Sequence, residues 1–176
     1  MLDFKVNFIN GAKIEIISDN SNDEYLVKFI DNTTQQVHYE SSLKNGYWAS
    51  PSIKYFIEWK IEVYDGNNKI YEYLYDASNQ KVLIYFDSKA LGDTISWFPF
   101  LEEFQKKHKC KIVASTYHNY FFEKKYPNFK FIPPGYIEQD IYAQYNIGWF
   151  YNKDKTINYN KVPINFKLPR WVANPN

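Results

Sequence analysis

The stretch Lys81-Val82-Leu83-Ile84-Tyr85-Phe86-Asp87 decides the fold class of this 176-residue chain. It is an almost continuous apolar run, which is typical of a parallel strand covered on both faces. The elements expected after it are a helix at 98–107, a strand at 111–116, a short helix at 118–126 and a strand at 129–132. This alternation of strands and helices indicates the first half of a Rossmann-like sheet.

The chain before residue 80 follows a different period. Between residues 57 and 63, apolar and charged residues alternate, as in a strand with one buried face. The turn sequence Asp65-Gly66-Asn67-Asn68 follows, and a second alternating segment at 70–75 completes a hairpin. Shorter strands are expected at 4–9, 13–17, 25–30 and 36–39. Several short strands separated by turns predict a small antiparallel sandwich or barrel.

The expected fold class is therefore α+β overall. An N-terminal antiparallel β sandwich or barrel occupies residues 1–79, and part of a Rossmann-like α/β domain occupies residues 80–150. Residues 151–176 are expected to be an irregular tail, because prolines interrupt them and no period is visible.

Composition excludes several classes of protein. The chain has 21 Lys and Arg against 20 Asp and Glu, so it lacks the basic character of most nucleic-acid binders. Its longest apolar runs are far below the ~18 residues of a membrane span, and its N-terminus lacks the apolar core of a signal peptide. The single cysteine, Cys110, rules out an internal disulfide and a multi-cysteine metal site, so no metal ligand is expected. A cytoplasmic protein is the interpretation that fits.

Chemistry is expected where the first strand of the α/β region ends. Ligands of open α/β sheets gather at the carboxyl ends of the strands. The strand ends near Asp87, and its loop leads to Gly92 and Asp93 at the start of a helix. Gly92 allows a tight turn there, and the free N–H groups of the helix start favour a negative charge. Asp93 could accept a proton from a hydroxyl nucleophile. The alternative is an ordinary helix N-cap.

The same residues resemble a known family. Leu91-Gly92-Asp93, with Pro99 a turn or two later, is similar to the opening of the catalytic domain of bacterial autotransporter O-heptosyltransferases, relatives of the lipopolysaccharide heptosyltransferases. Further segments that resemble this family are Phe8-Ile9-Asn10-Gly11, Glu58-Trp59-Lys60-Ile61, Ser115-Thr116-Tyr117-His118-Asn119 and Tyr142-Ala143-Gln144-Tyr145-Asn146-Ile147-Gly148-Trp149. The resemblance covers residues 1–150.

The resemblance implies a specific reaction. The fold would be a β-rich domain followed by a two-domain GT-B glycosyltransferase. The enzyme would transfer heptose from ADP-heptose to serine hydroxyls of an autotransporter adhesin, with Asp93 as the catalytic base. The residues expected to bind substrate are Ser88, Lys89, Ala90, Leu91, Gly92, Thr94, Thr116 and His118. The family also implies a large oligomer and a cysteine-bound iron, whose cysteines this sequence lacks; no cofactor is expected in this chain.

Other interpretations stay open. About half of the first Rossmann-like domain is visible and the donor-binding domain is not, so we expect the chain alone to be inactive. The chain could also be a non-catalytic module that binds glycan or protein, or an inactive truncated enzyme. Tyr71, Tyr73 and Tyr75 could form a sugar-stacking platform, although aromatic packing within the sheet is the simpler interpretation. A homo-oligomer, or a second polypeptide that completes the fold, is expected because half a sheet leaves an open edge.

Overall fold

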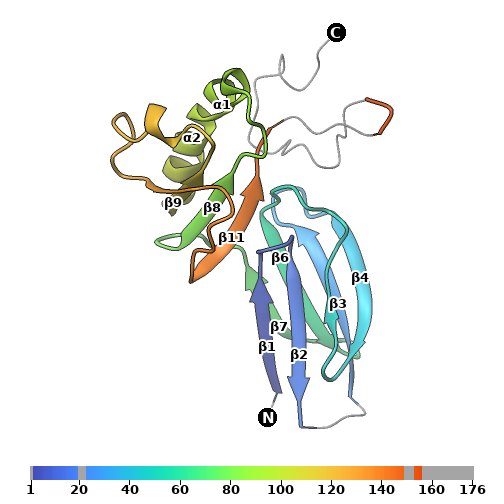
Figure 1. The fold of residues 1–176 in the computed structure, drawn as a ribbon. Coiled ribbons are helices and arrows are strands. Elements are labelled where there is room, and N and C mark those ends of the chain that lie inside the picture. Colours follow the sequence, from blue (N-terminus) through green and yellow to red (C-terminus); the bar gives the residue numbers. More distant parts are fainter. Residues whose placement is uncertain (1, 20–22, 149–152, 156–176) are drawn as a thin grey trace. The chain divides into compact units, whose positions relative to one another are not determined.

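The computed structural model describes residues 2–19, 23–148 and 153–155. The chain divides into two compact units, Met1–Asp76 and Ala77–Asn176, which we call the β unit and the α/β unit (Figure 1). Each unit is described by itself.

The β unit contains two antiparallel sheets (Figure 1). The first has the order β1 (Leu2–Asn7), β2 (Lys13–Ser18) and β5 (Trp48–Ala49). The second has the order β4 (Val37–Lys44), β3 (Glu24–Asp31), β6 (Trp59–Asp65) and β7 (Asn68–Leu74). The expected hairpin is confirmed, since β6 and β7 pair antiparallel with Asp65 opposite Asn68. The short strand β5 was not predicted.

Aromatic side chains join the two sheets of the β unit. Tyr71 on β7 stacks on Phe4 of β1, with ring centroids 4.3 Å apart. Tyr73 and Tyr75 both contact the ring of Phe8, at 6.0 and 4.9 Å. These three tyrosines therefore pack between the sheets, which favours the packing interpretation over a sugar-stacking platform.

The α/β unit contains a four-stranded parallel sheet. Its strands are β8 (Lys81–Tyr85), β9 (Lys111–Ser115), β10 (Lys130–Ile132) and β11 (Ile141–Asn146). The spatial order is β10-β9-β8-β11, and every neighbouring pair is parallel. In chain order this is 3-2-1-4, the strand order of a Rossmann-like sheet. The expected parallel sheet is confirmed; β11, its fourth strand, was not predicted.

The first helical region begins earlier than expected and consists of two helices. They are α1 (Leu91–Trp97) and α2 (Pro99–His108), with Phe98 ending the first and beginning the second. Pro99 occupies the first position of α2, where its missing N–H costs no helical hydrogen bond. Phe98 is fully buried and stacks on Phe122 with ring centroids 3.8 Å apart.

The predicted helix at 118–126 is wrong in its type. Only Asn119–Phe121 form one turn of 3-10 helix, and turns follow it. Two aromatic residues of this segment, Phe122 and Tyr126, nevertheless face the core and are buried against Phe98, whereas Tyr120 and Phe121 are exposed.

The two faces of the parallel sheet are covered differently. On one face, Phe104 of α2 contacts Tyr145 of β11 at 5.9 Å between ring centroids. On the other face, Leu83, Val113 and Ile132 form an apolar cluster. The return from β10 to β11, residues 133–140, contains no helix and carries Glu138, whose side chain is 6% exposed. Glu138 pairs with Lys81 of β8 at 3.2 Å and with Lys130 of β10 at 2.6 Å, so this return segment is tied to the sheet.

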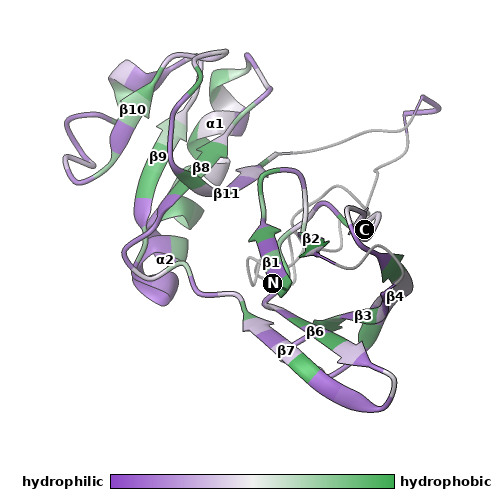
Figure 2. Ribbon diagram, turned by 90° about the horizontal axis from the view of Figure 1, so that it is seen from below, coloured by the Kyte–Doolittle hydropathy of each residue, from purple (hydrophilic) through white to green (hydrophobic). Residues whose placement is uncertain are grey.

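Hydropathy follows the layers of the α/β unit. Apolar residues concentrate on the strands β8 and β9, and polar residues on the loops around them (Figure 2). No helix among the described residues is both long enough and apolar enough to cross a membrane.

Candidate functional site at the carboxyl edge of the parallel sheet

The carboxyl ends of all four parallel strands lie at one edge of the sheet, as parallel pairing requires. Tyr85 of β8 is in register with Ser115 of β9 on one side and with Asn146 of β11 on the other. The loops that leave these strands carry the residues of the candidate site. A ligand of an open α/β sheet is expected at this edge.

Asp93 lies in the first turn of α1, close to the end of β8. It is the third residue of the helix, and one of its carboxylate oxygens accepts a hydrogen bond of 2.8 Å from the Ser88 hydroxyl. Ser88 also accepts a hydrogen bond from the N–H of Ala90, at 3.1 Å. The capping alternative is wrong, because Ala90 is the N-cap and makes no side-chain cap bond. The serine instead fixes the orientation of the carboxylate.

Asn119 organises the loop after β9. Its Oδ1 accepts hydrogen bonds from the N–H and the hydroxyl of Thr116, at 2.9 and 3.0 Å. Its Nδ2 donates to the carbonyl of Ile132 at the end of β10, at 2.8 Å. One side chain thus joins the ends of two neighbouring strands. The sequence alone predicts no role for Asn119, although the Thr-x-x-Asn spacing after a strand is a signal for such a loop.

His118 connects the β9 loop with the β8 loop. The backbone N–H of His118 donates to the Thr116 hydroxyl oxygen at 2.9 Å. The Nε2 atom of its ring lies 2.9 Å from the carbonyl oxygen of Lys89. A carbonyl oxygen only accepts, so Nε2 carries the proton in this hydrogen bond. The ammonium of Lys89 lies 5.3 Å from the ring centroid of Tyr117, within cation–π range. The structure therefore brings Lys89 and His118 together.

A second carboxylate belongs to the same edge. Asp87 follows β8 and is exposed, and its Oδ2 accepts a hydrogen bond from Nδ2 of Asn146 at the end of β11. This contact depends on β11, a strand that the sequence did not predict, so no role was expected for Asn146.

The other expected ligand-binding residues differ in their accessibility. Gly92 is exposed, and a Cβ placed on it would meet nothing within 4 Å. The backbone of Gly92 is helical, so the expectation that this glycine allows a tight turn is wrong. Leu91 is half-buried as the first residue of α1. Thr94 and Thr116 are buried; Thr94 donates to the Ala90 carbonyl at 3.2 Å. Both threonines thus support the loops from inside.

The described residues do not fit a cysteine-bound iron. Among them, no group of three or more His, Cys, Asp and Glu side chains could hold a metal ion. Cys110 is the single cysteine, and burial raises the pKa of its thiol to about 11. A thiol must lose its proton to bind a metal, so this residue is a poor ligand.

Comparison with known proteins identifies relatives that match nearly the whole chain. The autotransporter heptosyltransferase Aah of Escherichia coli is 30% identical over 173 residues, which are 96% of this chain and 42% of Aah. The chain is a homologue of autotransporter heptosyltransferases. The heptosyltransferase TibC of Escherichia coli O78:H11 is 25% identical over 92% of this chain and 39% of TibC. No family model matches the chain.

One autotransporter heptosyltransferase homologue is described as inactive. It is BimC of Burkholderia thailandensis, 28% identical over 149 residues, which are 83% of this chain and 34% of BimC. The chain spans less than half the length of each of these relatives.

The fold of this chain matches part of a solved heptosyltransferase structure. The crystal structure of the iron-containing dodecameric glycosyltransferase TibC from enterotoxigenic Escherichia coli matches 85% of this chain and 39% of the TibC chain, with a TM-score of 0.74 and 24% identity. A second structure, of dodecameric TibC with ADP-D-β-D-heptose, matches with a TM-score of 0.73 and the same identity and coverage.

Proposed function

We propose that this chain is the part of a protein O-glycosyltransferase that activates the acceptor. In this proposal heptose moves from an ADP-activated donor to a serine hydroxyl of an autotransporter adhesin. The observation that carries it is the carboxylate of Asp93, held by Ser88 at the ligand-binding edge of a Rossmann-like sheet. Homology with the autotransporter heptosyltransferases Aah and TibC supports the type of reaction.

Asp93 acts as the general base in this mechanism. The serine oxygen of the acceptor attacks the anomeric carbon of the heptose, and the bond from that carbon to the ADP phosphate oxygen breaks. ADP leaves with the bonding electrons, and the hydroxyl proton passes to the Asp93 carboxylate. The hydrogen bond from Ser88 leaves the other carboxylate oxygen of Asp93 available for the acceptor.

The neighbouring residues position this loop. His118 binds the Lys89 carbonyl and Asn119 holds the β9 loop on which His118 lies, so the loops after β8 and β9 form one hydrogen-bonded unit. The Lys89 ammonium and the open side of Gly92 are proposed to lie beside the donor. We also propose that the protein is cytoplasmic and that it assembles into a homo-oligomer, as TibC does.

The test measures transfer with the full product of the gene that encodes this chain. The protein is incubated with ADP-heptose and a serine-bearing adhesin repeat, and the intact mass of the repeat is recorded. Asp93→Asn is expected to lower the rate by roughly 10²–10⁴-fold, the usual contribution of a general base. Asp65→Asn, in the β6–β7 turn, is the matched control and is expected to keep the rate. A full rate with Asp93→Asn would show that another group takes the proton.

A non-catalytic role is the second candidate, and the inactive relative BimC favours it. Under this interpretation the protein binds an adhesin or a glycan without transferring sugar. Calorimetry of the full product of the gene separates the two functions: binding of the adhesin repeat with no binding of ADP-heptose would support the non-catalytic role and contradict the enzyme.

A further inference from the structure

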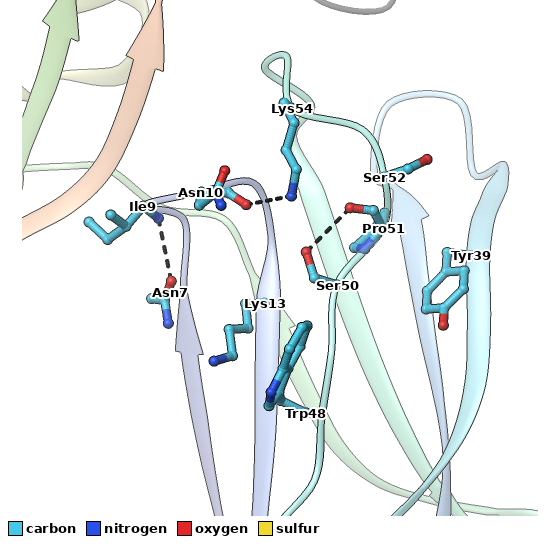
Figure 3. A pocket seen from close by; sticks show the side chains of 10 residues that line it. All are labelled: Asn7, Ile9, Asn10, Lys13, Tyr39, Trp48, Ser50, Pro51, Ser52 and Lys54. Carbon is cyan, nitrogen blue, oxygen red and sulfur yellow. Dashed lines mark hydrogen bonds between the residues drawn. The ribbon is translucent and has the colours of Figure 1, made fainter.

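The β unit has a concavity on its own surface, of about 710 Å³ (Figure 3). Its walls are the turn between β1 and β2, the strand β5 with the segment that follows it, and Tyr39 of β4. This volume lies within the usual range of roughly 300–1,000 Å³ for small-molecule pockets. None of the residues proposed for sugar transfer belongs to it.

Two aromatic rings are exposed in this concavity. Trp48 of β5 is 57% exposed, and Tyr39 is 38% exposed. The Lys13 ammonium lies 4.6 Å from the centroid of the Trp48 ring, and this cation–π interaction favours one orientation of the indole. A tryptophan that already favours one orientation needs less further ordering when a flat apolar surface stacks on it. The apolar face of a sugar ring is such a surface.

The polar groups of the concavity favour an anion with hydroxyl groups. Asn10, Ser50 and Ser52 supply amide and hydroxyl groups that can both donate and accept hydrogen bonds. The residues that line the concavity include Lys13 and Lys54 and no Asp or Glu. The Lys54 ammonium donates to the carbonyl of Asn10 at 2.8 Å, which leaves two of its three N–H donors for a ligand.

The backbone near Gly11 brings Lys54 into this position. Gly11 has φ +77°, and a Cβ on it would lie 2.9 Å from the carbonyl oxygen of Ile53. Glycine therefore allows the segment that carries Lys54 to approach the turn between β1 and β2. The position of Lys54 at the cationic end of the concavity therefore depends on the glycine at position 11.

We propose that this concavity binds an acidic saccharide. The sugar ring stacks on the face of the Trp48 ring that the Lys13 ammonium does not cover, its hydroxyl groups bond to the asparagine and serine side chains, and its carboxylate binds the Lys54 ammonium. Recognition thus combines stacking, which any pyranose offers, with charge, which only an acidic sugar offers.

The experiment titrates the full chain with methyl β-D-glucuronide and with methyl β-D-glucoside, which differ only in the carboxylate. Binding is followed by calorimetry and by the indole N–H shift of Trp48, with sodium acetate as the anion control. We expect a Kd for the glucuronide in the range of about 1 mM. We expect the glucoside to bind at least about tenfold more weakly, and acetate to show no saturable binding.

Variants of the chain complete the test. Trp48→Ala is expected to weaken glucuronide binding at least tenfold, and Lys54→Gln to lower it to the level of the glucoside. Tyr47→Ala removes an exposed ring next to Trp48 that does not line the concavity, and it is expected to change nothing. Absence of binding, equal binding of the two glycosides, saturable acetate binding or an unchanged Kd in Trp48→Ala would each overturn the proposal. Melting temperatures of the variants show whether they fold.

Discussion

Replacing Asn119 by alanine tests how the candidate site is held together. In the native chain its side chain accepts two hydrogen bonds from Thr116 and donates one to the carbonyl of Ile132. Thr116 and Ile132 are buried, so water cannot easily replace the lost partner. The substitution therefore leaves a buried N–H and a buried carbonyl without their partner, which is more costly than losing bonds at the surface.

The cost follows from these three hydrogen bonds. Each backbone group that loses its buried partner costs about 1–1.5 kcal/mol at the lower end of the usual range, and the Thr116 hydroxyl adds about 0.5 kcal/mol. We therefore expect Asn119→Ala to reduce the free energy of unfolding by about 3 kcal/mol. For a chain of this length, that corresponds to a fall in Tm of roughly 6–12 °C.

Urea unfolding of the full chain, followed by circular dichroism, measures this change. Asn119→Asp is a useful second variant, because it keeps the acceptor for Thr116 and places a carboxylate oxygen against the carbonyl oxygen of Ile132. The two oxygens repel each other, so its loss of stability is expected to shrink at acidic pH, where the protonated acid can donate to that carbonyl. Asn128→Ala, at an exposed turn, is the control and is expected to stay within about 0.5 kcal/mol. A loss below about 0.5 kcal/mol in Asn119→Ala would refute the assignment of Asn119 as the group that joins β9 and β10.

Three further predictions concern other parts of the α/β unit. Hydrogen bonds from Lys130 and Lys81 lower the pKa of Glu138, so its ionised form stabilises the fold above pH ~4.3 and this stabilisation is lost as the pH falls through the lowered pKa. Glu138→Gln is thus expected to lower Tm at pH 7 but not at strongly acidic pH, as measured by melting at a series of pH values. Phe98→Ala should cost about 3–5 kcal/mol in urea unfolding, because Phe98 is fully buried; a surface-like cost would contradict the packing. The Cys110 thiol, with a pKa of about 11, should react with a disulfide reagent at pH 8 only after urea unfolds the chain, and fast reaction without urea would show that it is accessible.

The sequence predicted those parts of the fold whose signal is local. The continuous apolar run at 81–87 identifies the strand β8. The alternation of apolar and charged residues at 57–63 identifies the strand β6. The strands β5 and β11 were missed for physical reasons. β5 has two residues, too few for a period, and β11 pairs with a strand far away in the chain. The Tyr142–Asn146 part of β11 also mixes polar and aromatic residues, and among the described strands it lies at the edge of its sheet.

The candidate site likewise has local features that the sequence predicts and contacts between distant loops that it does not. The position of Asp93 near the start of a helix could be inferred, because Gly and Asp after a buried strand are local signals. The hydrogen bond of Asp93 to Ser88 and that of His118 to Lys89 depend on the path of the loops, which the sequence does not encode in a simple period. The concavity around Trp48 depends on β5, so it was equally hidden from the sequence.

The late arrival of β11 matters while the protein is being made. β8 is the first strand of its sheet to leave the ribosome, yet it becomes a central strand only when Ile141 pairs beside Lys81. Until then the backbone donors and acceptors along one side of β8 are open, and such an edge readily pairs with another chain. A ribosome that pauses before residue 141 therefore holds a nascent chain prone to aggregation, and release of β11 ends that exposure.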